Sequence, residues 1–260
     1  WPVLTRPQVA GFEVATEAQS AYFVLKCVFR WVFCMYFSRY LITKLSFFVP
    51  ITRIKLVIAF ILSKLVLLFF KRKNRIIERN GIKFEVNLCE GIDLSLFLFG
   101  NFQKHVYENK SVILKENAVI FDVGANFGIM SLFYSKRFPT AKIFSFEPTY
   151  YAMEKFTKNL SLNPSLTSRI EPIQSFVFRE TRQNPELLAY SSWDVSSTNR
   201  ENRHKIHGGY LMPTKNVHSI SLDDFCQTRG IHTIDLIKID TDGYEYDVLR
   251  GAERSLKLFR

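Results

Sequence analysis

The sequence predicts an α/β protein in which helices cover both faces of a parallel sheet. Short apolar segments of the strand type alternate with helical patterns of roughly 10–15 residues through the second half of the 260-residue chain, which is the order of βαβ units. The first apolar segment of this series also runs directly into a glycine-containing loop, FDVGANFG, at residues 121–128. We expect this loop at the carboxyl end of the sheet, where open α/β sheets bind ligands.

Residues 1–75 have a composition of their own. They contain twelve Lys or Arg residues and two acids, Glu13 and Glu17, and so carry ten of the chain's eleven net positive charges. Basic charge can bind nucleic acid, but residues 20–70 are also strongly apolar and aromatic. That combination favours a membrane surface. We predict an apolar, basic helical segment that contacts a membrane, with packing on the domain or on a second chain as the alternative.

The sequence leaves open whether this segment spans the membrane or lies on it. The best window, residues 54–70, has 17 residues and contains Lys55 and Lys64. At about 1.5 Å per residue, a helix of this length covers roughly 25 Å, short of the roughly 30 Å hydrocarbon core. The basic run KRKNR follows at residues 71–75. If the segment spans, this run keeps the rest of the chain on the cytoplasmic side, so we expect a membrane-associated cytoplasmic domain.

Residues 76–260 are predicted to form the folded domain, and its elements follow in order. Asn80-Gly81 between short apolar stretches predicts a hairpin over residues 77–86. Strands are predicted over 119–123, 142–146, 170–178, 217–222 and 234–239. Helices are predicted over 94–107, 128–138, 150–162 and 246–258. The polar segment 179–216 interrupts the alternation, and we expect it to form loops or a hairpin.

Cysteine and histidine spacing predicts neither a disulfide framework nor a metal site. The four cysteines, at positions 27, 34, 89 and 226, show no C-x-x-C spacing, which is typical of a protein in a reducing compartment. His204 and His207 lie in the sequence HKIH. Because no further ligand is spaced to complete a metal site there, we interpret them as loop histidines.

The glycine loop favours a cationic ligand over a phosphate. Gly124 and Gly128 allow the backbone to approach a ligand closely, and Asn126 is placed to cap the helix that follows. A dinucleotide site requires G-x-G-x-x-G, whereas here Asn126 stands at the middle position. Asp122, two residues before Gly124, would repel pyrophosphate and attract an ammonium directly or through water. These features favour S-adenosylmethionine (SAM), which carries an ammonium and a sulfonium and no phosphate.

The second strand of the series ends in FSFEP, which places Glu147 25 residues after Asp122. An acid at this point suits ribose hydroxyl groups, since a carboxylate accepts two hydrogen bonds side by side. The loop, Asp122 and Glu147 lie in one βαβ unit, and together they predict a nucleoside site. The alternative is a glycine turn that only packs helix on strand.

A second cluster, LIKIDTDGYEYDVLRGAERSL, occupies residues 236–256. Asp240, Asp242 and Glu245 follow an apolar strand and would face the same rim as Gly124. Burying an acid is costly unless it is paired with a charge, hydrated or part of a functional site, and Lys238 is a candidate partner. The cluster is open to several interpretations: a general base for a hydroxyl, a cation site, a polar wall, or acids that cap a helix.

With both clusters in place, the chain resembles the FkbM family of SAM-dependent methyltransferases. The resemblance covers roughly residues 80–258. It rests on the stretches VIFDVGANFGIMSLFYSKRFPTAKIFSFEP, EKFTKNLSLN, SISLDDF and LIKIDTDGYEYDVLRGAERSL, and more loosely on GIKFEVN and DLSLFLFGNF.

The resemblance implies a class I (Rossmann-like) methyltransferase sheet and methyl transfer to a hydroxyl of a sugar, glycolipid, polysaccharide or similar small acceptor. It implies a SAM site lined by Asp122, Gly124, Ala125, Asn126 and Gly128, with Glu147 at the ribose. It also implies that Asp240 stands at the active-site rim, with Asp242 and Glu245 close by.

Two departures from the family pattern stand out. The family reads D-V-E-G where this chain has Asp240-Thr241-Asp242-Gly243. In addition, a seven-stranded sheet of this class requires three further strands after residue 258. The chain begins with Trp1 and stops at Arg260. We therefore expect a C-terminally truncated fragment.

The predicted reaction is O-methylation, with Asp240 as the first candidate for the base and Asp242 as the second. His204, His207, Trp193 and Tyr210 of the insertion are candidates for contact with the acceptor. A catalytically inactive membrane scaffold and a nicotinamide-dependent oxidoreductase are the alternatives. A nucleic-acid methyltransferase is disfavoured, because residues 76–260 have a net charge of only +1 and no D/N-P-P-Y/F/W run follows the fourth strand.

Overall fold

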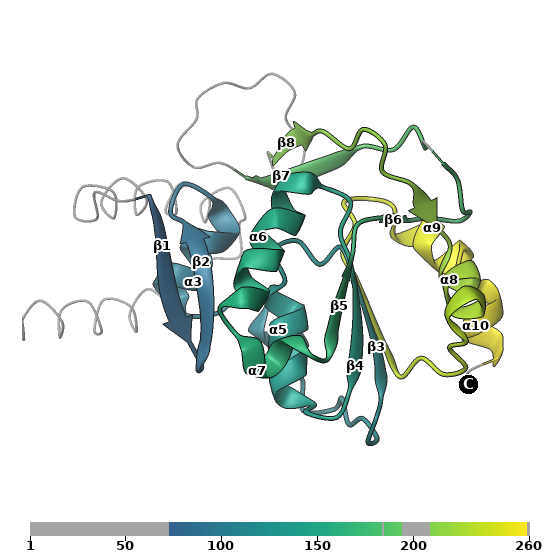
Figure 1. Cartoon of the computed structure of the whole chain (residues 1–260), viewed down its shortest axis with the longest axis horizontal. Coiled ribbons are helices and arrows are strands. Elements are labelled where there is room, and N and C mark those ends of the chain that lie inside the picture. Colours follow the sequence, from purple (N-terminus) through teal and green to yellow (C-terminus); the bar gives the residue numbers. More distant parts are fainter. Residues whose placement is uncertain (1–72, 184, 194–208, 259–260) are drawn as a thin grey trace, which may run out of the picture. The chain divides into compact units, whose positions relative to one another are not determined.

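The computed structural model describes residues 73–183, 185–193 and 209–258 (Figure 1). The predictions for residues 20–70, and those for His204 and His207, lie outside these residues. Among the described residues, no helix has the length and apolar character needed to cross a membrane. The first strand, β1 (Asn74–Arg79), crosses the boundary that the sequence places between residues 75 and 76.

A parallel sheet of four strands forms the centre of the domain, in the spatial order β10-β3-β4-β5. The strands are β3 (Val119–Val123), β4 (Lys142–Phe146), β5 (Ile170–Ile173) and β10 (Leu236–Ile239). In this register, Asp122 lies beside Lys238 on one side and beside Ser145 on the other. The carboxyl ends of β3, β4 and β10 therefore meet at one edge, as expected for consecutive βα units.

Helices pack on both faces of this sheet, which confirms the predicted fold class (Figure 1). On one face, Ile120 and Ile143 pack against residues of α5 (Ile129–Arg137) and α6 (Tyr150–Ser161). On the other face, Phe121 and Phe144 pack with residues of α8 (Leu222–Arg229) and α9 (Glu245–Arg250). Successive side chains of a strand point to opposite faces, so alternate apolar residues of β3 supply both cores.

The N-terminal hairpin and two short helices lie against α5 and α6. β1 and β2 (Ile82–Asn87) are antiparallel, and the turn residues Asn80 and Gly81 have φ values of 52° and 69°, which confirms the predicted Asn-Gly turn. The single helix predicted over 94–107 is wrong. α3 (Gly91–Phe99) ends at Gly100 in the left-handed conformation, and α4 (Lys104–Tyr107) begins after Gln103. A left-handed glycine at this position is a common helix terminator.

Two other predicted elements divide, and the strand predicted over 217–222 is limited to Ser219–Ile220. The strand predicted over 170–178 divides, because β6 (Phe176–Val177) leaves the main sheet and pairs with β9 (Ser219–Ile220). The helix predicted over 246–258 divides into α9 and α10 (Glu253–Leu258) at Gly251, where an added Cβ would lie 2.2 Å from the carbonyl oxygen of Phe178. The predicted insertion contains a hairpin, β7 (Ala189–Trp193) with β8 (Gly209–Met212).

Two helices were not predicted, α7 (Pro164–Thr167) and α8. Ser221 caps α8 by accepting a hydrogen bond from the Asp224 backbone N–H, and Gly230 ends the helix in the left-handed conformation. The sequence carries this signal, a Ser followed by an acid three residues later and a glycine at the end.

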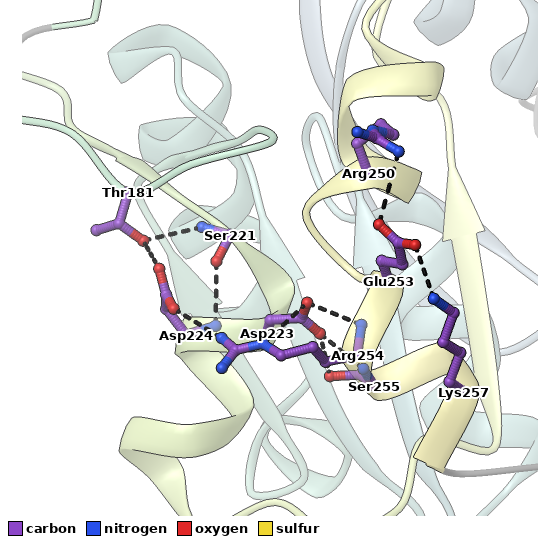
Figure 2. A network of polar contacts seen from close by, with 9 residues as sticks. All are labelled: Thr181, Ser221, Asp223, Asp224, Arg250, Glu253, Arg254, Ser255 and Lys257. Carbon is purple, nitrogen blue, oxygen red and sulfur yellow. Dashed lines mark hydrogen bonds and ion pairs between the residues drawn. The ribbon is translucent and has the colours of Figure 1, made fainter.

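A polar network joins α8 to α10 (Figure 2). The Asp223 carboxylate accepts hydrogen bonds from the backbone N–H groups of Arg254 (2.9 Å) and Ser255 (2.7 Å), and from Ser255 Oγ (2.7 Å). Partial burial alone would raise the pKa of Asp223, but these hydrogen bonds lower it below its usual value. An acid of one helix therefore caps the first turn of another, where the N–H groups lack intrahelical partners.

Candidate active site

A cavity of about 310 Å³ opens at the carboxyl edge of the sheet. One wall is the glycine loop, including Gly124, Ala125 and Asn126, together with Glu147 at the end of β4. The adjoining part of the wall is the loop after β10, residues 240–242. Both sequence clusters therefore line one cavity, because the carboxyl ends of neighbouring parallel strands lie at the same edge of the sheet.

Gly124 allows these two loops to meet. Its φ is +75°, and an added Cβ would lie 1.9 Å from the carbonyl oxygen of Asp240. The N–H groups of Gly124 and Ala125 both donate to the carbonyl of Phe146, at 3.0 and 2.9 Å. A side chain at position 124 would push the two cavity walls apart, so the glycine is required by the close approach of backbone to backbone.

The prediction that Asn126 caps the following helix is wrong. Its side-chain oxygen accepts from the adjacent Phe127 N–H (2.8 Å), and the N-cap of α5 is Gly128, which makes no side-chain capping bond. Gly128 is a packing position, since an added Cβ would lie 2.1 Å from the Phe156 ring. Gly128 does not line the cavity, whereas Asn126, with φ 50°, does.

Asp122 lies behind the loop. Its side chain is 0% exposed; Oδ2 accepts from Ser131 Oγ (2.6 Å), and Lys238 Nζ lies 3.1 Å from Oδ1. The contact at Oδ1 is an ion pair without the geometry of a directed hydrogen bond. Lys238 also donates to the Gly124 carbonyl (2.7 Å). Lys238, which the sequence suggested as a partner for the second acidic cluster, therefore pairs with Asp122 and fixes the glycine loop.

Glu147 lies at the cavity with only 6% of its surface exposed. Oε2 accepts from the Asn126 N–H (3.0 Å), and Oε1 accepts from the N–H (2.9 Å) and Oγ1 (2.6 Å) of Thr149. Burial raises the pKa of Glu147 above its usual value, while these hydrogen bonds and the charge of Lys238 oppose the rise. A carboxylate offers about four acceptor positions, so capacity remains for a hydroxyl group of a ligand.

The three acids after β10 have separate positions. Asp240 and Asp242 line the cavity, and Asp242 adopts a positive φ of 55°. Glu245 does not line it. Glu245 Oε1 accepts from the N–H groups of Thr241 (3.0 Å) and Gly243 (3.2 Å). Partial burial alone would raise the pKa of Glu245, but hydrogen bonds from these backbone groups lower it. Glu245 therefore holds the turn that carries the other two acids.

Residues that the sequence did not single out complete the walls. Ile92, Phe102 and Gln103 come from the N-terminal elements, and residues 188–191 come from the start of β7. Tyr210, a predicted acceptor contact, is not among the lining residues, although Tyr190 on the paired strand is. No sequence signal marks these residues, because they reach the cavity through the packing of distant elements.

A sequence profile described as "Methyltransferase FkbM domain" matches residues 122–260. The chain belongs to the FkbM methyltransferase family. Methyltransferase sdnD of Sordaria araneosa is 26% identical over 174 residues, covering 58% of this chain and 66% of its own length. The 2-O-methyltransferase NoeI of Sinorhizobium fredii is 26% identical over 157 residues, covering 56% and 62%.

The hexuronic acid methyltransferase AglP of Haloferax volcanii is 24% identical over 143 residues, covering 55% of this chain and 53% of its own length. The chain thus spans less than two thirds of these relatives. Among solved structures, a methyltransferase FkbM from Methylobacillus flagellatus is similar at 15% identity and a TM-score of 0.38, covering 63% of this chain and 39% of that one.

Family membership confirms SAM as the cofactor, and the charges of the cavity suit it. The lining residues described here include three acids, Glu147, Asp240 and Asp242, and a single basic side chain, Lys238. Lys238 is paired with Asp122, so the three lining acids leave the wall with a net charge of about −3. Such a wall attracts a ligand with an ammonium and a sulfonium and would repel phosphate groups.

Proposed function

We propose that this chain transfers the methyl group of SAM to a hydroxyl oxygen of a small acceptor, with a sugar as the favoured class. The observation that carries the proposal is the placement of a buried carboxylate, Glu147, and a solvent-exposed one, Asp240, in the wall of one cavity. The first suits the ribose of the donor, and the second is accessible to an incoming acceptor.

The chain's residues divide the work of such a reaction. Glu147 would accept a hydrogen bond from a ribose hydroxyl group, and the loop at Gly124, Ala125 and Asn126 would hold the donor against the sheet edge. When bound, SAM supplies a methyl group already activated by the sulfonium. The protein therefore has to place the acceptor oxygen in line with that methyl group and remove its proton.

Asp240 is proposed as the base. As the oxygen–carbon bond forms, the hydroxyl proton passes to the Asp240 carboxylate, and the electron pair of the carbon–sulfur bond remains on sulfur. Asp242 lies in the same wall and is the second candidate. We assign no direct chemical role to Asp122 and Glu245: Asp122 would position the glycine loop through Lys238, and Glu245 would position the turn at Gly243.

The choice of a sugar acceptor rests on the relatives and on the cavity. Two relatives are described as a 2-O-methyltransferase and a hexuronic acid methyltransferase. The acceptor side of the cavity combines an amide and a hydroxyl, from Gln103 and Ser191, with the rings of Phe102 and Tyr190. Polar groups beside aromatic faces suit a sugar ring, which has hydroxyl edges and apolar C–H faces.

The test is a titration of the full chain with SAM by calorimetry, followed by transfer of radiolabelled methyl to a panel of methyl glycosides and hexuronic acids. Glu147→Ala is expected to abolish SAM binding. Glu154→Ala is the matched control, because Glu154 is an exposed acid of α6 that does not line this cavity. Displacement of SAM by NAD would support the oxidoreductase alternative. Normal SAM binding without methyl transfer to any acceptor would favour the inactive scaffold.

Asp240→Asn tests the base. Its transfer rate should fall by about 10²–10⁴, the usual contribution of a positioned acid or base, while its affinity for SAM stays unchanged. A variant that keeps full turnover would exclude Asp240 from this role.

We also propose, from composition alone, that residues 20–70 associate with a membrane. The segment is apolar and basic, so the full chain should sediment with vesicles that contain anionic lipid and dissociate as the salt concentration rises. If the same fraction of the protein sediments with and without vesicles, membrane association is excluded.

A further inference from the structure

Gln103 occupies a constrained position between α3 and α4. Its φ and ψ are 49° and 41°, the left-handed conformation, which glutamine adopts far less readily than glycine or asparagine. Such a conformation persists where the surrounding structure imposes it, and it is found disproportionately at functional sites.

The helix that follows Gln103 is anchored to the rest of the domain. The Tyr107 ring at the end of α4 stacks on Phe133 of α5, with ring centroids 3.9 Å apart. Arg137 of α5 donates to the carbonyls of Tyr107 (2.6 Å) and Val112 (2.7 Å). α4 is therefore anchored to α5, a helix that packs on the central sheet. Gln103, the N-cap residue of α4, is held at the cavity rim as a result.

The Gln103 amide reaches across the cavity rim to the second acidic cluster. Nε2 donates to Asp240 Oδ2 at 3.2 Å, between residues 137 positions apart in the chain. Both residues line the cavity. Among the described residues, Gln103 is the one side chain that donates to the Asp240 carboxylate.

We propose that Gln103 is a positioning residue for Asp240, which it holds in the orientation needed to take the proton of the acceptor hydroxyl. A neutral amide suits this task. It fixes the rotation of the carboxylate through a hydrogen bond, but it does not neutralise the negative charge as a paired lysine or arginine would. Gln103 precedes the region matched by the family profile, which begins at residue 122, so the N-terminal elements would supply part of the catalytic apparatus.

This inference rests on the proposed function, and a double-mutant cycle tests the two separately. Gln103→Ala should lower kcat for methyl transfer to a methyl glycoside by about tenfold, the usual effect of losing a hydrogen bond to a charged group, with the KM for SAM unchanged. In an Asp240→Ala background, Gln103→Ala should cause no further loss. An equal loss in both backgrounds, or full kcat in the single variant, would overturn the inference.

Two more variants distinguish the effect of the hydrogen bond on activity from the effect of the backbone conformation. Asparagine tolerates the left-handed conformation better than glutamine but is one methylene shorter, so Gln103→Asn should lose as much activity as Gln103→Ala. Recovery of full activity by asparagine would mean that only the backbone matters. Asn101→Ala is the matched control, because this nearby amide donates to the Phe99 carbonyl (3.0 Å) and does not line the cavity; it should leave kcat unchanged.

A second readout needs no acceptor. In urea unfolding of the same four proteins of the cycle, the midpoint shift caused by Gln103→Ala should shrink when Asp240 is already alanine. An identical shift in both backgrounds would show that the hydrogen bond is not formed in solution, and would overturn the inference even if no glycoside is methylated. Full turnover by Asp240→Ala with this coupling intact would instead reject the proposed role of Asp240.

Discussion

A buried charge cluster, made of Glu90, Asp93 and Lys155, predicts how the stability of the domain depends on pH. It joins the N-terminal elements to α6. Lys155 Nζ contacts Asp93 Oδ2, lies 3.2 Å from Glu90 Oε2, and lies 4.3 Å from the ring centroid of Phe127 in the glycine loop. Asp93 is 0% exposed, and its Oδ1 accepts no hydrogen bond. Two carboxylates thus share one ammonium in a buried place, which favours protonation of one of them.

The size of this pH-dependent change in the free energy of unfolding follows from the pKa of Asp93. Burial, followed by the nearby Glu90, raises the pKa of Asp93 from its ordinary 3.8 to about 7, against the opposing effects of Lys155 and the Asn87 N–H. At about 1.36 kcal/mol per pH unit, this difference corresponds to roughly 4 kcal/mol. Because the native state binds this proton more tightly than the unfolded state, the contribution is complete below about pH 4 and is lost as the pH rises through 7.

The assay is urea unfolding of the wild type and Asp93→Asn between pH 5 and pH 8. Asparagine imitates the protonated carboxyl, so the difference in free energy of unfolding between the two proteins should be smallest at the acidic end of this range. Between pH 5 and pH 8 the wild type should lose about 3 kcal/mol relative to the variant. Such a loss is large beside the 5–15 kcal/mol typical of a domain.

Asp223→Asn is the control for this experiment. The pKa of Asp223 is lowered, so its contribution is lost only as the pH falls into the acidic range below about 4. This variant should differ from the wild type by a constant amount between pH 5 and pH 8. A wild type whose stability relative to Asp93→Asn is constant or rises over that interval would refute the reasoning on the buried cluster.

Other single contacts carry predictions of their own. Gly124→Ala should destabilise the domain and abolish SAM binding, measured by thermal unfolding and SAM titration, because its Cβ would lie 1.9 Å from the Asp240 carbonyl oxygen. Gly230→Ala has a similar φ of +61° with open space around it, so it should cost only about 1–2 kcal/mol; an equal loss in both would contradict the close-approach argument. Glu147→Gln should weaken SAM binding about 10–100-fold through loss of charge-assisted hydrogen bonds, and an unchanged Kd by calorimetry would remove Glu147 from the site. Phe225→Ala should lower the free energy of unfolding in urea by about 3–5 kcal/mol, since its ring packs edge-on against three phenylalanine rings of β3 and β4; a loss below about 1 kcal/mol would contradict that packing.

The elements that could be predicted are those whose signals are local. β3 and β4 have the predicted bounds, because each is a short apolar run bounded by polar or turn residues. The hairpin turn could be predicted because Asn80 and Gly81 both tolerate positive φ. α8 escaped prediction because its sequence, LDDFCQTR, is polar, although its Ser221 cap and Gly230 terminator were visible in the sequence.

The breaks in predicted elements depend on contacts that the sequence does not display. Gly251 interrupts the last helix where it meets the Phe178 carbonyl, and β6 leaves the sheet because its partner, β9, lies 43 residues further along. Neither residue spacing nor helix propensity contains this information. It arises from the packing of one element on another.

The sequence by itself determined the class of fold, the family, and the location of two acidic clusters at the ends of parallel strands. It did so because strand alternation, glycine loops and the edge rule of α/β sheets are properties of short segments. Only the tertiary structure decided which side chains meet: Asp122 with Lys238, Asp93 with Lys155, and Gln103 with Asp240. The members of each pair are 62 to 137 residues apart, and their contact depends on how whole helices and strands pack. The same composition of acids and bases is compatible with other pairings. For the two ion pairs, burial selects among them, since a charge removed from water needs its partner within a few ångströms. The Gln103–Asp240 contact is exposed, and it depends instead on where packing places α4 beside the loop after β10.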